Sequence, residues 1–260
     1  MEHFYLTNLE TNLLEFLDKA RYATSRQLAS LFFTSSTKPA TQLRRANFTL
    51  MKLTNQGLLH RLDRRIGGVR AGSGSFVYGI TLKGLKILKQ QDEAVILRYK
   101  NTYEPSLGHL EHTLAVTQLY LEAVQLDRHH SEICLERFAF EPKSWRGYST
   151  VAGTGSTLKP DAYLQLSNGA FEDSYFIELD RNTESLARIV NKCKQYIAYY
   201  RTGIEQRQNE VFPFVLWVVP DDNRKQALAK AIQAELYNDW ELFSVVTLDE
   251  FSSHLKGGQA

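Results

Sequence analysis

The stretch KPDAYLQLSNGAFEDSYFIELDR, residues 159–181, decides the fold of the larger part of this 260-residue chain. Residues 159–166 and 174–181 each read as a strand rich in apolar residues. The sequence SNGAFED between them is typical of a turn. The stretch therefore predicts a pair of antiparallel strands joined by a short connection.

Three carboxylates lie at one end of this predicted strand pair. Alternate side chains of a strand face the same way, so Phe176, Glu178 and Asp180 share one face. Pairing of the two strands would bring Asp161 toward Glu178. Three carboxylates at the end of a central sheet repel one another unless a cation lies among them, and oxygen ligands suit Mg²⁺ or Mn²⁺. Asp161, Glu178 and Asp180 are therefore the candidate metal ligands.

A purely structural interpretation of the same carboxylates stays open. Asp161 can cap a turn after Pro160, and Glu178 can pair with Arg181 or Lys159. Two carboxylates one residue apart on an apolar strand are costly to bury without a partner or an ion, which favours the metal site.

Helices and strands alternate around the strand pair. The Gly-, Ser- and Thr-rich residues 146–158 are expected to form a loop. The other predicted elements are helices over 107–126, 184–200 and 223–236, and strands over 133–142, 212–220 and 242–248. This order predicts an α/β sandwich around a mixed central sheet.

The first part of the chain has a different pattern. Three helices are predicted over 8–19, 26–33 and 40–55, followed by two strands over 58–65 and 75–82 and a helix over 82–90. Three helices followed by a two-stranded hairpin form the winged-helix arrangement, a relative of helix-turn-helix in which the third helix enters the major groove.

The charges divide between the two parts. Residues 1–90 hold 14 Lys and Arg against 5 Asp and Glu, whereas residues 91–260 hold 17 against 24. A basic module of this kind is expected to bind a polyanion, and the candidates are double-stranded and also single-stranded DNA. The predicted DNA-binding residues are Arg44, Arg45, Lys52, Arg61, Arg64, Arg65 and Arg70.

The third predicted helix is expected to bury Leu43, Phe48, Met51 and Leu53. A winged helix that contacts another protein is the alternative interpretation of this part. The sequence does not tell which base pairs are read, because one Arg can serve phosphate or guanine.

The spacing of the carboxylates resembles that of the PD-(D/E)XK nuclease superfamily, which has the restriction-endonuclease-like fold. Pro160-Asp161 is followed, 17 positions after Asp161, by Glu178-Leu179-Asp180. The lysine of that motif would fall at Asp180, so a lysine of the following helix is expected to replace it. Lys192 and Lys194 are the candidates, and Lys194 lies nearer the predicted buried stripe than Arg188 or Gln195 does. Both stay open as catalytic residues.

The combination of both parts resembles the replication-relaxation family of plasmid proteins and the MobC-like relaxases, over roughly residues 8–250. The resemblance implies a winged-helix DNA-binding domain at 1–92, a linker at 93–106 and a nuclease-like domain at 107–255. It implies an enzyme that nicks plasmid DNA at a transfer origin, with Mg²⁺ or Mn²⁺ held by the three carboxylates, together with other relaxosome proteins.

Two other functions stay open: a non-catalytic DNA-binding accessory factor with a degenerate nuclease fold, and a transcription regulator. The histidine string of the commoner relaxases is absent from the seven histidines.

The sequence contains no apolar run long enough for a membrane span and begins without a secretory signal. Two cysteines fit a reducing cytoplasm, which is the expected location.

Overall fold

The computed structural model describes residues 5–36, 38–66, 74–91, 105–149, 153–169 and 171–257. The chain divides into two compact units, residues 1–121 and 122–260. The predicted domain limits at 92 and 107 stay a prediction about which parts fold independently. In the described ranges, no helix combines the length and the apolar character needed to cross a membrane.

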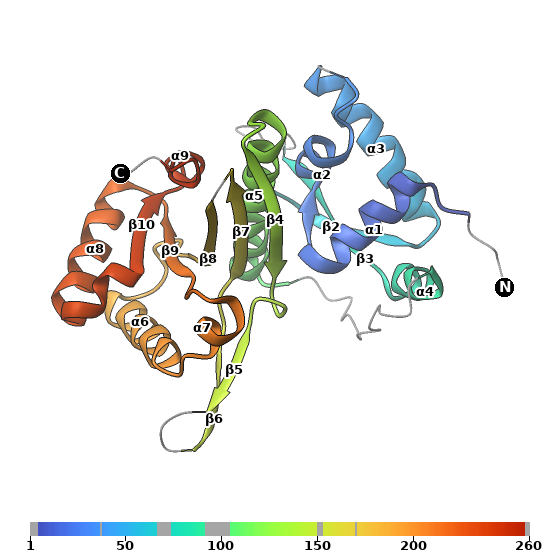
Figure 1. The fold of residues 1–260 in the computed structure, drawn as a ribbon. Helices are drawn as coiled ribbons and strands as arrows, with labels where there is room; N and C mark the ends of the chain where they lie inside the picture. Colours follow the sequence, from blue (N-terminus) through green and yellow to red (C-terminus); the bar gives the residue numbers. More distant parts are fainter. Residues whose placement is uncertain are drawn as a thin grey trace. The chain divides into compact units, whose positions relative to one another are not determined.

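The first unit is built from helices and a small sheet (Figure 1). Three strands pair in the order β1-β3-β2, with both pairs antiparallel. The predicted order of three helices, two paired strands and a further helix is confirmed, and the winged-helix interpretation of this order stays a prediction. The elements are α1 (Asn8–Ala20), β1 (Ala23–Thr24), α2 (Ser25–Phe32), α3 (Pro39–Asn55), β2 (Leu59–Ile66), β3 (Ser75–Ile80) and α4 (Leu82–Gln91), followed by α5 (Leu107–His129), whose first part belongs to this unit.

The helix ends follow local chemistry. Thr7 and Thr24 each form a capping box, with Glu10 and Gln27 respectively, at the starts of α1 and α2. Gly57 lies just beyond α3 at a φ of 73°, a left-handed conformation that glycine adopts without strain, so the predicted stop of this helix is confirmed.

The expected core face of α3 is partly wrong. Ala46, Leu50 and Leu53 are buried, whereas Phe48 and Met51 are 71% and 56% exposed. The pattern misled because the helix has more apolar residues than its inward face can accommodate, and only packing against the other elements decides which of them are buried.

The second unit is an α/β sandwich. Its five-stranded sheet has the order β10-β9-β8-β7-β4, antiparallel from β4 to β8 and parallel from β8 to β10. The predicted fold class, with a mixed central sheet, is confirmed. The elements are β4 (Ile133–Phe140), β5 (Arg146–Ser149), β6 (Gly155–Leu158), β7 (Ala162–Asn168), β8 (Phe171–Leu179), α6 (Leu186–Tyr200), α7 (Ile204–Asn209), β9 (Phe214–Val219), α8 (Asp222–Leu236), η1 (Tyr237–Leu242), β10 (Phe243–Thr247) and α9 (Phe251–Leu255).

The expectation of a loop over 146–158 is wrong. Strands β5 and β6 form an antiparallel hairpin that extends away from the five-stranded sheet (Figure 1). Arg146 pairs with Leu158 at its base, where Leu158 is fully buried. The Gly, Ser and Thr content indicated a loop, but Arg146, Tyr148 and Leu158 supply the side chains that anchor a hairpin to the core.

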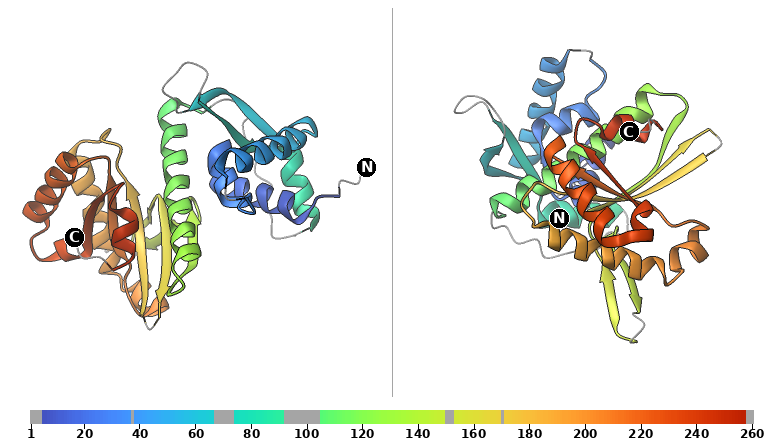
Figure 2. Two further views of the ribbon diagram at one scale, coloured as in Figure 1. Left: turned by 90° about the horizontal axis from the view of Figure 1, so that it is seen from above. Right: turned by 90° about the vertical axis from the view of Figure 1, so that its left-hand side faces the viewer.

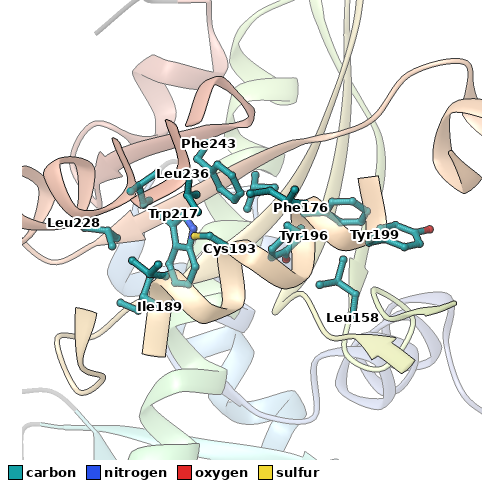
Figure 3. Close-up of a cluster of buried hydrophobic side chains, with 14 of the residues drawn as sticks. Leu158, Phe176, Ile189, Cys193, Tyr196, Tyr199, Trp217, Leu228, Leu236 and Phe243 are labelled. Atoms are coloured by element: carbon teal, nitrogen blue, oxygen red, sulfur yellow. The ribbon is translucent and has the colours of Figure 1, made fainter. Parts of the chain in front are cut away.

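Helices α6 and α8 lie on one face of the sheet (Figure 2). A large hydrophobic cluster fills the space between them and the sheet. Figure 3 shows Cys193 beside Trp217, and Tyr196 beside Phe176. The ring centroids of Tyr196 and Phe176 are 5.7 Å apart. This face is also the one to which Phe176 and Glu178 belong, so the cluster surrounds the predicted catalytic strand.

Candidate active site

Glu178 lies near the end of β8, the middle strand of the sheet, and is 1% exposed. Because it alternates with Phe176 on the face covered by α6, its carboxylate points toward that helix. One oxygen forms an ion pair with the Nζ of Lys192, and the other accepts a hydrogen bond from the hydroxyl of Tyr196 at 2.5 Å. Both partners come from α6, four residues apart on one side of the helix.

Burial dominates the electrostatics of this pair. Loss of solvent and, to a smaller extent, the nearby Asp161 raise the pKa of Glu178 to about 8 against the opposing effects of Lys192 and Tyr196. Burial alone would lower the pKa of Lys192, but Glu178 first and Asp161 second raise it above its usual value. Lys192 is therefore charged at neutral pH, held by two carboxyl groups.

Asp161 comes directly before β7, opposite Glu178. The register pairs Ala162 with Ile177, and the Asp161 amide continues the ladder by donating to the Ile177 carbonyl at 3.1 Å. One carboxylate oxygen of Asp161 accepts a hydrogen bond from the Leu179 amide at 2.8 Å. The predicted approach of Asp161 to Glu178 is confirmed by this register.

Asp180 belongs to a different group of contacts. It follows the last residue of β8 and is 4% exposed. Arg224 of α8 donates to one oxygen at 2.5 Å, and the Asn182 amide donates to the other at 2.9 Å. Arg224 also donates to the Glu184 carbonyl at 2.6 Å. Asp180 thus ties the segment after β8 to the start of α8.

The contacts of the three carboxylates decide which of them could bind a metal ion. Within the described parts of the chain, no three His, Cys, Asp or Glu side chains lie together as a metal site. Asp180 does not fit such a site, because Arg224 and a backbone amide satisfy both of its oxygens. Both oxygens of Glu178 are likewise engaged, by Lys192 and Tyr196, so a divalent cation would fit between Asp161 and Glu178 only in place of Lys192, which now supplies the positive charge that two adjacent carboxylates need.

The two candidate lysines of α6 differ in position. Lys192 joins the Glu178 group, and its side chain is 28% exposed. Lys194 is 52% exposed and lies 3.5 Å from Glu235, away from Glu178. The sequence left the choice between these two lysines open; burial of Tyr196 and Tyr199 turns the inward face of α6 toward Lys192.

Sequence reasoning missed two residues of this region, Tyr196 and Arg224. Tyr196 is fully buried four positions after Lys192, so helical spacing contained the signal. Arg224 had no such signal, because its contact with Asp180 joins residues 44 apart in the chain. Two other polar residues of α6 near Tyr196 do not contact Glu178. Gln195 is exposed, and the Tyr199 hydroxyl donates to Glu205 at 2.8 Å.

The predicted DNA-binding residues of the first unit are only partly described. Arg44 and Arg45 are exposed on α3, and Arg45 donates to the Ser35 hydroxyl at 2.6 Å. Lys52 is engaged in an ion pair with Glu10 at 2.6 Å. The guanidinium of Arg61 lies 4.4 Å from the ring centre of Phe76. The side chains of Arg64 and Arg65, and all of Arg70, lie outside the described residues.

A family model described as replication-relaxation matches residues 14–215. No match was found among curated proteins. A solved structure titled "restriction endonuclease FokI bound to DNA" aligns with 90% of this chain at 11% identity and a TM-score of 0.26. The alignment covers 63% of that chain, so this chain spans less than two thirds of its length.

Proposed function

Since the chain belongs to the replication-relaxation family, we propose that it is a metal-dependent DNA nickase acting in plasmid replication or mobilisation. One observation carries the proposal: helix α6 brings Lys192 onto Glu178, next to Asp161. Two carboxylates and a lysine are the groups that phosphodiester cleavage with a divalent cation requires. They come from the residue before β7, from β8 and from α6, all in the second unit.

The roles of the side chains follow from their contacts. Asp161 and Glu178 would hold Mg²⁺ or Mn²⁺, which when bound activates water and neutralises phosphate charge. The Lys192 ammonium would stabilise the charge that builds on the cleaved phosphate. Tyr196, buried behind Glu178, fixes the orientation of its carboxylate. Arg224 keeps Asp180 neutralised, so that this third carboxylate adds no repulsion.

The first unit would hold duplex DNA at a plasmid origin of transfer. Residues 1–90 carry a net charge of +9, from 14 Lys and Arg and 5 Asp and Glu. Neutralisation of phosphates by such residues releases counterions, which gives affinity without sequence preference. Other relaxosome proteins are proposed partners of the complex.

A second candidate function is a DNA-binding accessory factor without catalysis. It is favoured by the completeness of the ion pairs, because Glu178 and Asp180 are both buried and both paired with cationic side chains of the chain itself. Such pairs are stable without a metal, and a nuclease fold can lose activity and persist as a binding module.

Nicking of supercoiled plasmid separates the two functions. The substrate is a plasmid with the DNA that flanks the gene, incubated with Mn²⁺ and the full chain. We expect wild type to convert it to open circles, Lys192→Met to be slower by about 100-fold or more, and Lys194→Met, its matched control, to be unchanged. Equal rates for wild type and Lys192→Met would contradict the proposed site. A band shift without cleavage by wild type would favour the accessory factor.

A further inference from the structure

One face of α3 presents two large apolar side chains to solvent. Phe48 is 71% exposed and Met51 is 56% exposed, although both occur in a helix whose inward face is well packed. At about 100° per residue, Arg44, Phe48, Met51 and Asn55 fall within about 60° of one another. We call these four residues the α3 stripe, and all four are exposed.

The neighbouring basic residues of α3 lie beside the stripe and have contacts within the unit. Arg45 donates to Ser35, and Lys52 pairs with the buried carboxylate of Glu10. Among the arginines and lysines of α3, Arg44 is therefore the one that shares the stripe with Phe48 and Met51. The stripe combines one cation, one amide and two apolar side chains.

Charge complementarity identifies the occupant as nucleic acid. Helix α3 contains no Asp or Glu in its 17 residues, and residues 1–90 are strongly basic. An α-helix fits the major groove of B-DNA, where thymine presents a C5-methyl group that apolar side chains contact. A protein partner would gain nothing from this charge unless it were acidic, whereas DNA uses both the charge and the apolar groups.

We infer that Phe48 and Met51 contact thymine methyl groups in the major groove, so that this chain prefers sites with thymine at the steps beneath α3. Arg44 donates from the same stripe to a base edge or to phosphate. The inference rests on the proposed DNA binding of the first unit. It is independent of cleavage, because it concerns affinity in the absence of a divalent cation.

Replacing thymine by uracil removes only the methyl group from the DNA. The duplex that flanks the gene is amplified once with thymidine and once with deoxyuridine triphosphate, and the affinity of the full chain is measured by fluorescence anisotropy in EDTA. Wild type is expected to bind the thymine duplex about fourfold more tightly for each methyl group covered, which corresponds to about 0.8 kcal/mol.

Two variants of the α3 stripe test whether its apolar side chains cause the preference for thymine. Phe48→Ala and Met51→Ala are each expected to bring the thymine-to-uracil affinity ratio closer to one. Alanine is the strongest helix former, so α3 remains intact at these exposed positions. Phe171→Ala is the matched control, because Phe171 is 75% exposed at the start of β8 and lies in the other unit. It should leave the ratio unchanged.

Equal affinity of wild type for both duplexes would overturn the inference, and this comparison needs no variant. The inference is also overturned if Phe48→Ala leaves the ratio unchanged and instead dissociates a dimer in sedimentation, since the stripe would then be an interface between copies. Failure of the nicking experiment with an intact thymine preference would remove the proposed catalysis and leave this inference standing.

Discussion

At the scale of single residues, burial of the Glu178 carboxyl group makes the stability of the fold depend on pH. It is 1% exposed in the middle of the sheet, and its pKa is raised to about 8 from a usual value of 4.5. The folded chain therefore retains a proton that the unfolded chain releases above pH 4.5, and the contact of Glu178 with Lys192 becomes an ion pair as this proton is lost near pH 8. The stability that this proton contributes is complete below pH 4.5 and is lost as the pH rises through 8.

Substitution of Glu178 by glutamine tests this protonation. Between pH 4.5 and 8, the unfolding free energy of the chain with Glu178 should fall relative to that of Glu178→Gln by on the order of a few kcal/mol. The comparison is made in a Lys192→Met background, because the pKa of Lys192 is raised chiefly by the Glu178 carboxylate that the substitution removes. Urea denaturation of both proteins at several pH values measures the difference. Parallel curves would contradict a buried, protonatable Glu178.

The sequence predicted Asp161 and Glu178 as neighbours because a strand pair fixes register over short distances. It could not place Asp180, whose partner Arg224 lies in a helix 44 residues further along the chain. It also left Lys192 and Lys194 unresolved. They differ only in which side of α6 packs on the sheet, and the burial of Tyr196 and Tyr199 decides that.

At the scale of elements, a second buried network holds the β5–β6 hairpin and α7 against α6. Glu205 of α7 is 1% exposed and accepts hydrogen bonds from Arg146 at 2.6 Å, Tyr199 at 2.8 Å and Asn209 at 2.6 Å. The Arg146 guanidinium also lies 5.2 Å from the ring centre of Phe176. The network therefore joins the hairpin, two helices and strand β8.

Removal of the Glu205 carboxylate should be strongly destabilising. Breaking a buried pair leaves Arg146, which is 18% exposed, without its counter-charge, so Glu205→Ala is expected to lower the unfolding free energy by about 3–5 kcal/mol. Glu235→Ala is the matched control, because Glu235 is 58% exposed and its pair with Lys194 is worth at most about 1 kcal/mol. Chemical denaturation measures both. Equal losses would contradict a structural network at Glu205.

Helices and strands were predicted correctly where the spacing of apolar residues alone indicated them. Helix α3 and the strands β7, β8 and β9 followed from the sequence pattern, whereas the short elements β1, α7 and α9 were not predicted. The hairpin at 146–158 was missed because Gly, Ser and Thr indicate a loop, while its pairing depends on the anchoring of Arg146 and Leu158. Phe48 and Met51 were misplaced for the opposite reason, since apolar character alone indicated burial.

At the scale of the whole molecule, the chain joins a basic unit of helices and a small three-stranded sheet to an α/β unit in which Asp161 lies near Glu178. The family match over residues 14–215 extends across both units. The sequence predicted this division from the charge asymmetry between residues 1–90 and 91–260. The first part of α5 nevertheless packs in the first unit, where Leu110 and Leu114 join Leu62 and Val77.

The central claim is that Asp161 and Glu178 form a cation site that Lys192 fills when no metal is bound. Calorimetric titration of the full chain with Mn²⁺ tests it most directly. Wild type should bind one ion, and Asp161→Asn should lose this binding. Lys192→Met should bind Mn²⁺ at least about tenfold more tightly, because a competing unit charge within a few ångströms is removed. Absence of Mn²⁺ binding by wild type, or equal binding by Asp161→Asn, would contradict the claim.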